Sequence, residues 1–338
     1  MKNESVDYNL LQALVKRSRM SSYWLAVLLT LVLVLFLLLA AFLDGQMDSL
    51  GGWEFWRQFI GAPVIVGYIF MIYPYMLRLS RNAAETFRRL QPPGIPENAA
   101  PVSHAPKRRW EWLSIAVGVL FWVLVQQAWD WEWGVDGWWL YIYALVSFSL
   151  LFGLMAWLIY VSLVESRNLN RLSRQKLDLD IFNTSALIPV SRASLSTSFA
   201  FLGGISISLI FQTVDSLLVW QNITIYSILV LATLLIFFFS MWSTHRTMAA
   251  IKHDELALAR SELEKALRRL KESSLIKQSP QSGDLHAAVA AWGTYERHVR
   301  EAREWPFNAV ILRRLAASTL IPALVYLLKV FLGIRLFG

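Results

Sequence analysis

The sequence predicts an all-α polytopic membrane protein, and three observations carry that prediction. Of the 338 residues, 56% are hydrophobic and only 17% are charged, and the mean hydropathy is +0.44, whereas about a quarter of the residues in a soluble domain are charged. Apolar runs long enough to cross roughly 30 Å of hydrocarbon recur along the chain. No run alternates with period two, so helices are expected rather than barrel strands.

The expected architecture has six transmembrane helices, a seventh C-terminal membrane segment, and a cytoplasmic helical pair between the sixth and the seventh. Residues 1–22 form a cytoplasmic N-terminus. The first span, residues 23–43, is about twice as long as the hydrophobic core of a cleavable signal, so it is expected to remain as an anchor. The second span, residues 59–79, contains Pro63 and Pro74, which predict kinks.

Two polar loops flank the third and fourth spans. The first loop, residues 80–109, contains a proline-rich stretch that is expected to be extended. The third span follows at residues 110–129 and the fourth at residues 140–164, with a short loop rich in tryptophan and acidic residues between them. The second polar loop covers residues 165–195.

The fifth span, residues 196–220, and the sixth, residues 223–242, are joined by a tight turn and complete a membrane domain of residues 23–243. The fifth span is the polar member of the set, because small and hydroxyl-bearing residues interrupt its apolar run. A helix that faces only lipid has no use for such residues, so another helix, water or an ion should lie against them.

Residues 244–306 are expected to form a helical hairpin beneath the membrane. Leu256, Leu263 and Leu270 are seven residues apart and predict one packing seam. The helix that carries these leucines is expected to continue the sixth span. A second helix, residues 286–304, should pack antiparallel to it.

The C-terminal part, residues 307–338, holds a last membrane segment at residues 315–334. Its length is sufficient to span, although Pro322 and Lys329 lie inside it. A full crossing is the favoured interpretation, and a bent re-entrant segment is the alternative.

The distribution of basic residues predicts the orientation. Lys and Arg number 4 before the first span, 7 from position 78 to position 109, 5 between the fourth and fifth spans, and 13 from position 245 to position 314, whereas the three opposite loops contain only Arg57. Because Lys and Arg gather in cytoplasmic loops, the N-terminus and the large loops are expected in the cytoplasm. We expect a multi-pass protein of the cytoplasmic (plasma) membrane.

A polar face is predicted on the fifth span. At about 100° per residue, four of its residues fall within roughly 40° of one another, with Gln212 beside them. The four are Thr197, Gly204, Ser208 and Asp215. One interpretation is an ion- or proton-handling face with Asp215 near the outer side. The other is close helix packing, with Asp215 reaching interfacial water.

The last membrane segment carries a second polar face within about 80°. Its members are Thr319, Pro322, Tyr326 and Lys329. This face is a candidate pore lining, and the alternative is a lysine that snorkels from a peripheral helix.

The loop after the third span holds an acidic group that is a candidate outer rim. Asp130, Glu132 and Asp136 would concentrate cations there. The alternative is an ordinary outer loop, since such loops are poor in Lys and Arg. The pair Gly203-Gly204 is expected to serve close packing, because no phosphate-loop residues follow it.

Several function classes are not indicated. There is no cysteine, and the five histidines do not have metal-ligand spacing, so no metal site is predicted. The net charge of +8 is arranged by topology rather than as a nucleic-acid patch. Nucleotide-binding, protease and kinase motifs are absent, so neither a cofactor nor an enzymatic activity is predicted.

The layout of seven helices, an inside N-terminus, a cytoplasmic helical anchor and a polar last segment resembles that of insect odorant and gustatory receptor-like channels, although no sequence signature of those proteins is present. The leading hypothesis is a homo-oligomeric ion permeation pathway that takes a small ion or small-molecule ligand, with the lipid bilayer as its environment. The alternative is a non-conducting sensor, scaffold or effector that docks a partner through its cytoplasmic helices.

Overall fold

The structure is a computed structural model that describes residues 9–91, 106–128, 137–173, 175, 182, 184–275, 282–302, 304–305 and 309–337. Every regular element in these ranges is a helix, and they contain no strand. The all-α prediction is therefore confirmed for the described part of the chain.

Six of the described helices are long and apolar enough to cross a membrane. They are α2 (Ser22–Leu43), α3 (Trp53–Arg89), α5 (Trp138–Ser173), α6 (Ile188–Phe211), α8 (Trp220–Leu275) and α10 (Ala309–Phe337). This set supports a multi-pass membrane protein, and it includes the C-terminal segment whose crossing the sequence left open.

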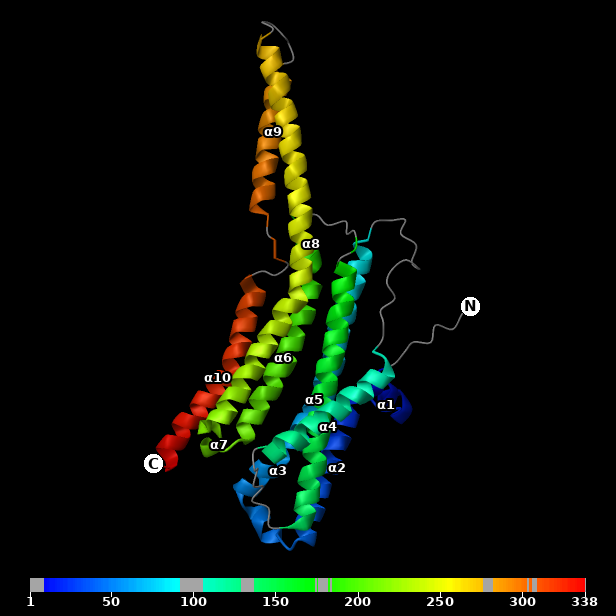
Figure 1. Cartoon of the computed structure of the whole chain (residues 1–338), viewed down its shortest axis with the longest axis vertical. Coiled ribbons are helices and arrows are strands. Elements are labelled where there is room, and N and C mark those ends of the chain that lie inside the picture. The colour runs from blue at the N-terminus through cyan, green and yellow to red at the C-terminus, as the bar shows by residue number, and fades with distance from the viewer. Residues whose placement is uncertain are drawn as a thin grey trace, which may run out of the picture.

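The helix at the expected third span, α4 (Arg108–Ala128), is not among the six. Figure 1 shows α4 running obliquely across the other helices of its half of the molecule. The count of seven spans therefore stays a prediction.

The helices α2, α3, α4 and α5 pack into one body, with the short α1 (Leu10–Ser18) against it (Figure 1). Between α2 and α3 lies a 3-10 turn, Met47–Gly51. The Asp44 carboxylate at the end of α2 accepts hydrogen bonds from the backbone N–H of Trp139 at 3.2 Å and of Leu140 at 2.7 Å. The start of α5 is thereby fixed beside the end of α2.

The fifth span is not one helix, which corrects the expectation for residues 196–220. The helix α6 ends at Phe211, Gln212 is extended, and a short helix α7 (Val214–Leu218) begins anew. The cause is local, because the Thr213 side chain accepts a hydrogen bond from the Ser216 N–H at 2.9 Å and so caps α7. A 3-10 turn, Thr184–Leu187, precedes α6.

The sixth span and the helix after it form one element, as the sequence predicts, because α8 runs without interruption over 56 residues. The helix α9 (Ser282–Glu301) packs along its distal half. Ala259 and Val299 are fully buried between the two. At the rim Arg260 Nε lies 3.1 Å from Glu296 Oε1, and the Tyr295 hydroxyl donates to Glu255 at 3.0 Å.

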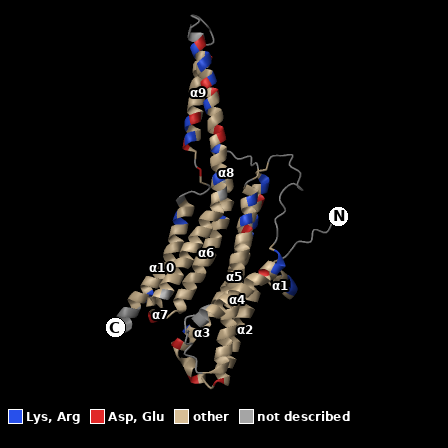
Figure 2. Ribbon diagram, in the orientation of Figure 1, with Lys and Arg blue, Asp and Glu red and all other residues tan. Residues whose placement is uncertain are grey.

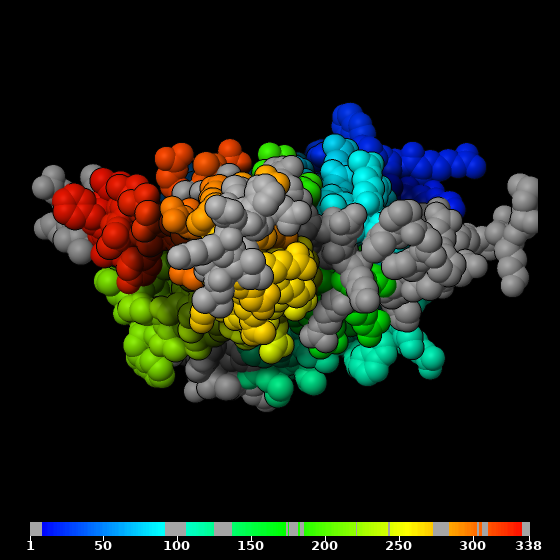
Figure 3. All heavy atoms as spheres, turned by 90° about the horizontal axis from the view of Figure 1, so that it is seen from above, coloured from blue at the N-terminus to red at the C-terminus, as the bar shows by residue number. Residues whose placement is uncertain are grey.

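The pair α8–α9 extends well beyond the other helices (Figure 1). Its base is tied to the rest of the chain by the Thr247 hydroxyl, which donates to the Ser173 carbonyl at 2.7 Å, and by stacking of His245 on Trp305 with ring centroids 4.0 Å apart. Viewed along the long axis, α10 and the N-terminal helices occupy opposite ends of an elongated molecule (Figure 3).

Close backbone contact joins α3 to α6. The Tyr68 hydroxyl donates to the carbonyls of Phe199 at 3.3 Å and Ala200 at 3.1 Å, and it lies where a Cβ on Gly203 would collide with it. The Gly203-Gly204 pair therefore serves close packing, as the sequence predicts.

Candidate functional site

The candidate site is the interruption between α6 and α7, which we call the α6 break and define as residues 209–213. The last carbonyls of a helix have no partner within that helix. In hydrocarbon, where water is absent, leaving such carbonyls unpaired costs several kcal/mol each. The chain therefore needs donors at this point.

Lys329 of α10 supplies those donors. Its ammonium donates to the carbonyl of Leu209 at 3.0 Å and to the carbonyls of Ile210 and Gln212. The ammonium sits at the carbonyl end of α6, where the helix dipole favours a positive charge. One side chain thus satisfies three backbone acceptors on another element.

Neutral hydrogen bonds surround this lysine. Ser208 Oγ lies 2.8 Å from the hydroxyl of Tyr226 on α8. The Ser216 hydroxyl donates to the side-chain oxygen of Gln212 at 2.6 Å, and the Asn222 amide donates to the Ser216 carbonyl at 2.7 Å. From α10, the Tyr326 hydroxyl donates to the Leu217 carbonyl at 3.3 Å. The break is therefore a connected polar network built from four helices.

An apolar cluster lies beneath this network. Its buried members are Leu202, Ile205, Leu209 and Leu217. Tyr226, Val325 and Tyr326 pack against them. Because these side chains come from α6, α7, α8 and α10, their packing sets the separation between the backbone of α10 at Lys329 and the end of α6.

The two polar faces predicted from the sequence meet each other here. Ser208 and Gln212 come from the predicted face of the fifth span, and Tyr326 and Lys329 come from that of the last segment. Pro322 is buried on the same side of α10. The four polar residues thus bond to neighbouring helices within the chain.

The remaining predicted residues lie elsewhere. The Thr197 hydroxyl bonds back to the Ala193 carbonyl at 3.3 Å, and the Thr319 hydroxyl to the Leu315 carbonyl at 2.9 Å. Gly204 faces the ring of Tyr68. These three residues take no part in the α6 break.

Asp215 lies in the first turn of α7 and is exposed. The prediction that it shares a helical face with Thr197, Gly204 and Ser208 is wrong, because α6 ends four residues before it. A carboxylate in the first turn of a helix is favoured by the helix dipole. The predicted rim of Asp130, Glu132 and Asp136 falls outside the described residues.

Sequence reasoning missed a buried carboxylate, Glu111 of α4, which has no exposed surface. Its Oε2 accepts hydrogen bonds from the backbone N–H of Leu10 at 2.7 Å and from the indole N–H of Trp157 at 3.4 Å. Its Oε1 has no hydrogen-bond partner among the described residues. The sequence did carry one indication of this buried carboxylate, because Glu111 is a single acidic residue just inside the apolar segment of the expected third span.

Two further side chains complete the surroundings of Glu111. The amide of Asn9, which caps α1, donates to the hydroxyl of Tyr73. The ring of Tyr73 lies 4.9 Å from that of Trp157, centroid to centroid. We call Asn9, Tyr73, Glu111 and Trp157 the α1 dock, because they hold the start of α1 against α3, α4 and α5.

Among the described residues, no three His, Cys, Asp or Glu side chains lie close enough to hold a metal ion. No protein family, no curated protein sequence and no solved structure matches the chain.

Proposed function

We propose that the chain is a multi-pass protein of the cytoplasmic membrane that presents the α8–α9 pair to a protein partner in the cytoplasm. The observation that carries this proposal is the shape of the pair. It projects beyond every other described helix while remaining continuous, through α8, with an apolar segment able to cross the bilayer (Figure 1).

Charge supports a cytoplasmic position for the pair. Figure 2 shows Lys and Arg interspersed with Asp and Glu on the pair, and Lys and Arg on the neighbouring ends of α3 and α5, whereas acidic residues gather at the opposite end near the α2–α3 connection. This is the asymmetry expected when the basic end faces the cytoplasm.

The contacts of the predicted pore residues also favour a non-conducting role. Ser208, Tyr326 and Lys329 bond to helices of the same chain. A residue whose polar atoms are satisfied inside its own chain has fewer free atoms to offer a passing ion. The α8–α9 pair, by contrast, keeps exposed positions such as Leu258, which is 50% exposed.

Photo-crosslinking in native membranes tests this proposal. A crosslinker placed at Leu258 of the full-length chain should capture one partner in stoichiometric amount, and Leu258→Glu should abolish capture through a crosslinker at a neighbouring position. The control is Leu14→Glu, because Leu14 is equally exposed but lies on α1. Recovery of self-crosslinks alone would contradict the proposal.

A homo-oligomeric ion permeation pathway is the second candidate function. The observation that favours it is the α6 break, because interrupted helices whose free carbonyls face a cation are how membrane transport proteins build ion sites. In this structure the ammonium of Lys329 occupies the position beside these carbonyls that an ion would take. Recordings from purified protein in lipid bilayers test this candidate, which predicts a conductance that changes in Lys329→Ala and Asp215→Asn. A silent bilayer would rule against it.

A further inference from the structure

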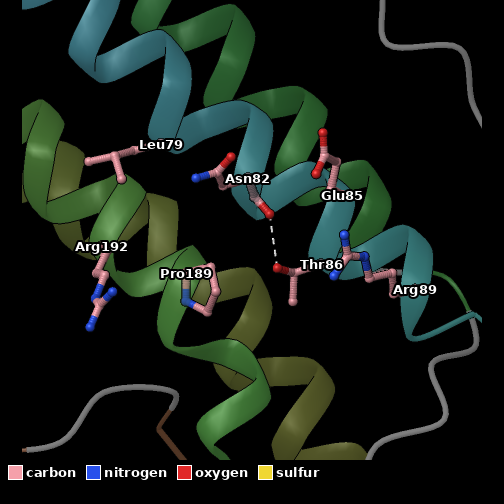
Figure 4. Close-up of a pocket in the computed structure, with 7 residues that line it drawn as sticks. All are labelled: Leu79, Asn82, Glu85, Thr86, Arg89, Pro189 and Arg192. Carbon is pink, nitrogen blue, oxygen red and sulfur yellow. Dashed lines mark hydrogen bonds between the residues drawn. The ribbon is translucent and has the colours of Figure 1, made fainter.

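A hollow of about 300 Å³ lies between the distal end of α3 and the start of α6 (Figure 4). Leu79 and Pro189 form its apolar part. Arg89 of α3 and Arg192 of α6 lie on opposite sides of it. The hollow lies apart from both the α6 break and the α1 dock.

The position of the hollow along the helices is informative. The apolar part of α3 ends near Leu79, and seven of the ten residues from 80 to 89 are polar or charged. On α6, Arg192 lies in the second turn and is the only charged residue of that helix. On both helices, basic side chains therefore border the hollow at one end of the apolar stretch, which is where a bilayer passes from hydrocarbon to headgroups.

The charges of the lining favour an anion. Arg89 and Arg192 are exposed, and neither forms an ion pair with a described carboxylate. A guanidinium binds phosphate through two parallel hydrogen bonds, which suits it to this anion better than a point charge. The Asn82 side chain adds further donors beside them.

Two other features limit which anion fits. Thr86 donates its hydroxyl to the Asn82 carbonyl at 2.9 Å, so its proton is engaged (Figure 4). Glu85 contributes one negative charge on the α3 side of the lining. With two arginines and one glutamate the lining carries a formal charge of +1, which matches a phosphodiester better than a doubly charged phosphate.

We propose that this hollow binds the phosphodiester of an anionic phospholipid headgroup, with Arg89 and Arg192 as its ligands. The apolar part at Leu79 and Pro189 borders the glycerol, and the acyl chains extend along the apolar part of α3. This binding depends on α3 and α6 spanning the bilayer and is independent of any partner of the α8–α9 pair.

Native mass spectrometry of the full-length protein in detergent tests the proposal. Phosphatidylglycerol added to delipidated protein should be retained more strongly than phosphatidylcholine. The double variant Arg89→Ala/Arg192→Ala should lower phosphatidylglycerol affinity by roughly tenfold to a hundredfold, the loss expected for two charge-assisted contacts. Glu85→Gln should retain or strengthen binding, because it removes a negative charge.

The matched control is Arg88→Ala, since Arg88 is an exposed neighbour on α3 that does not line the hollow. An equal loss in Arg88→Ala, or no loss in the double variant, would overturn the proposal. Displacement of phosphatidylglycerol by millimolar inorganic phosphate would instead identify a site for a soluble anion and overturn the lipid assignment. Thermal unfolding of each variant should match the parent, because all three arginines are exposed.

Discussion

In both the α1 dock and the α6 break, a charged side chain from another helix pairs with backbone groups at the end of a helix, but the two charges have opposite signs. In the dock, the Glu111 carboxylate accepts the N–H of Leu10 at the beginning of α1. In the break, the Lys329 ammonium donates to the carbonyls at the end of α6. Each charged side chain reaches from a distant helix to the terminus whose dipole has the opposite sign.

The difference between the two sites lies in how many backbone groups depend on the charge. Glu111 serves one backbone N–H and one indole, and one of its oxygens has no described partner. Lys329 serves three carbonyls. The comparison teaches that the α6 break should be the more sensitive of the two to loss of its charge, because more backbone acceptors would be left unpaired.

Lys329→Ala is therefore expected to have the largest effect. Removing the ammonium should lower the free energy of unfolding by roughly 3 kcal/mol or more, since each charged hydrogen bond contributes about 1.5–3 kcal/mol. Thermal unfolding in detergent measures this loss, with Arg313→Ala, an exposed site on the same helix, as the control. Equal melting of the two variants would show that the carbonyls at the break find other donors.

Glu111→Ala is expected to have the second largest effect. It leaves the Leu10 N–H and the Trp157 indole without an acceptor, which should cost about 1–3 kcal/mol and loosen α1. Limited trypsin digestion should then cut faster at Lys16 and Arg17. Glu111→Gln keeps one acceptor oxygen and should lie between the parent and the alanine variant. If α1 stays protected in Glu111→Ala, Asn9 and Tyr73 suffice to dock it.

Gly203→Ala tests the contact that joins the two halves of the molecule. The added Cβ would collide with the Tyr68 hydroxyl, so a loss of about 1–3 kcal/mol is expected. Gly204→Ala is the matched control, because its Cβ would meet Tyr68 at an ordinary 3.8 Å. Tyr68→Phe should relieve part of the defect, and additive effects in the double variant would argue against direct contact.

Glu296→Gln on the α8–α9 pair should have the smallest effect. Hydrogen bonds from Arg300 and Arg260 hold the pKa of Glu296 below its ordinary value. The contribution of this carboxylate is therefore present above about pH 4.5 and is lost as pH falls through the lowered pKa. Because both arginine partners of Glu296 are largely exposed to solvent, thermal unfolding at neutral pH should shift only slightly. A large shift would mean that the pair depends on this one contact.

Much of the helical architecture could be predicted from local patterns. Apolar runs located the membrane-compatible helices, and the seven-residue spacing of Leu256, Leu263 and Leu270 anticipated the pairing of α8 with α9. Hydropathy did not reveal the α6 break, because the break depends on a hydrogen bond from the Ser216 N–H to the Thr213 side chain and a hydropathy average contains no information on such bonds. The lysine that satisfies the break lies 120 residues from Leu209 in sequence.

The α1 dock escaped prediction for a similar reason. Glu111 appeared as one acidic residue beside a basic flank, and its partner Leu10 is 101 residues away. Ser208, Gln212, Tyr326 and Lys329 were correctly named as members of polar faces, but the contact between the two faces was not predicted. Periodicity shows which residues share a face and does not show what that face meets.

The unbroken course of α8 has a mechanical consequence. At about 1.5 Å per residue, its 56 residues form a stiff rod roughly 84 Å long. A tilt of roughly 10° at its membrane end would move the far tip by about 15 Å. Since membrane helices tilt when bilayer thickness changes, the rod converts a small change in the surrounding lipid into a large displacement at its tip.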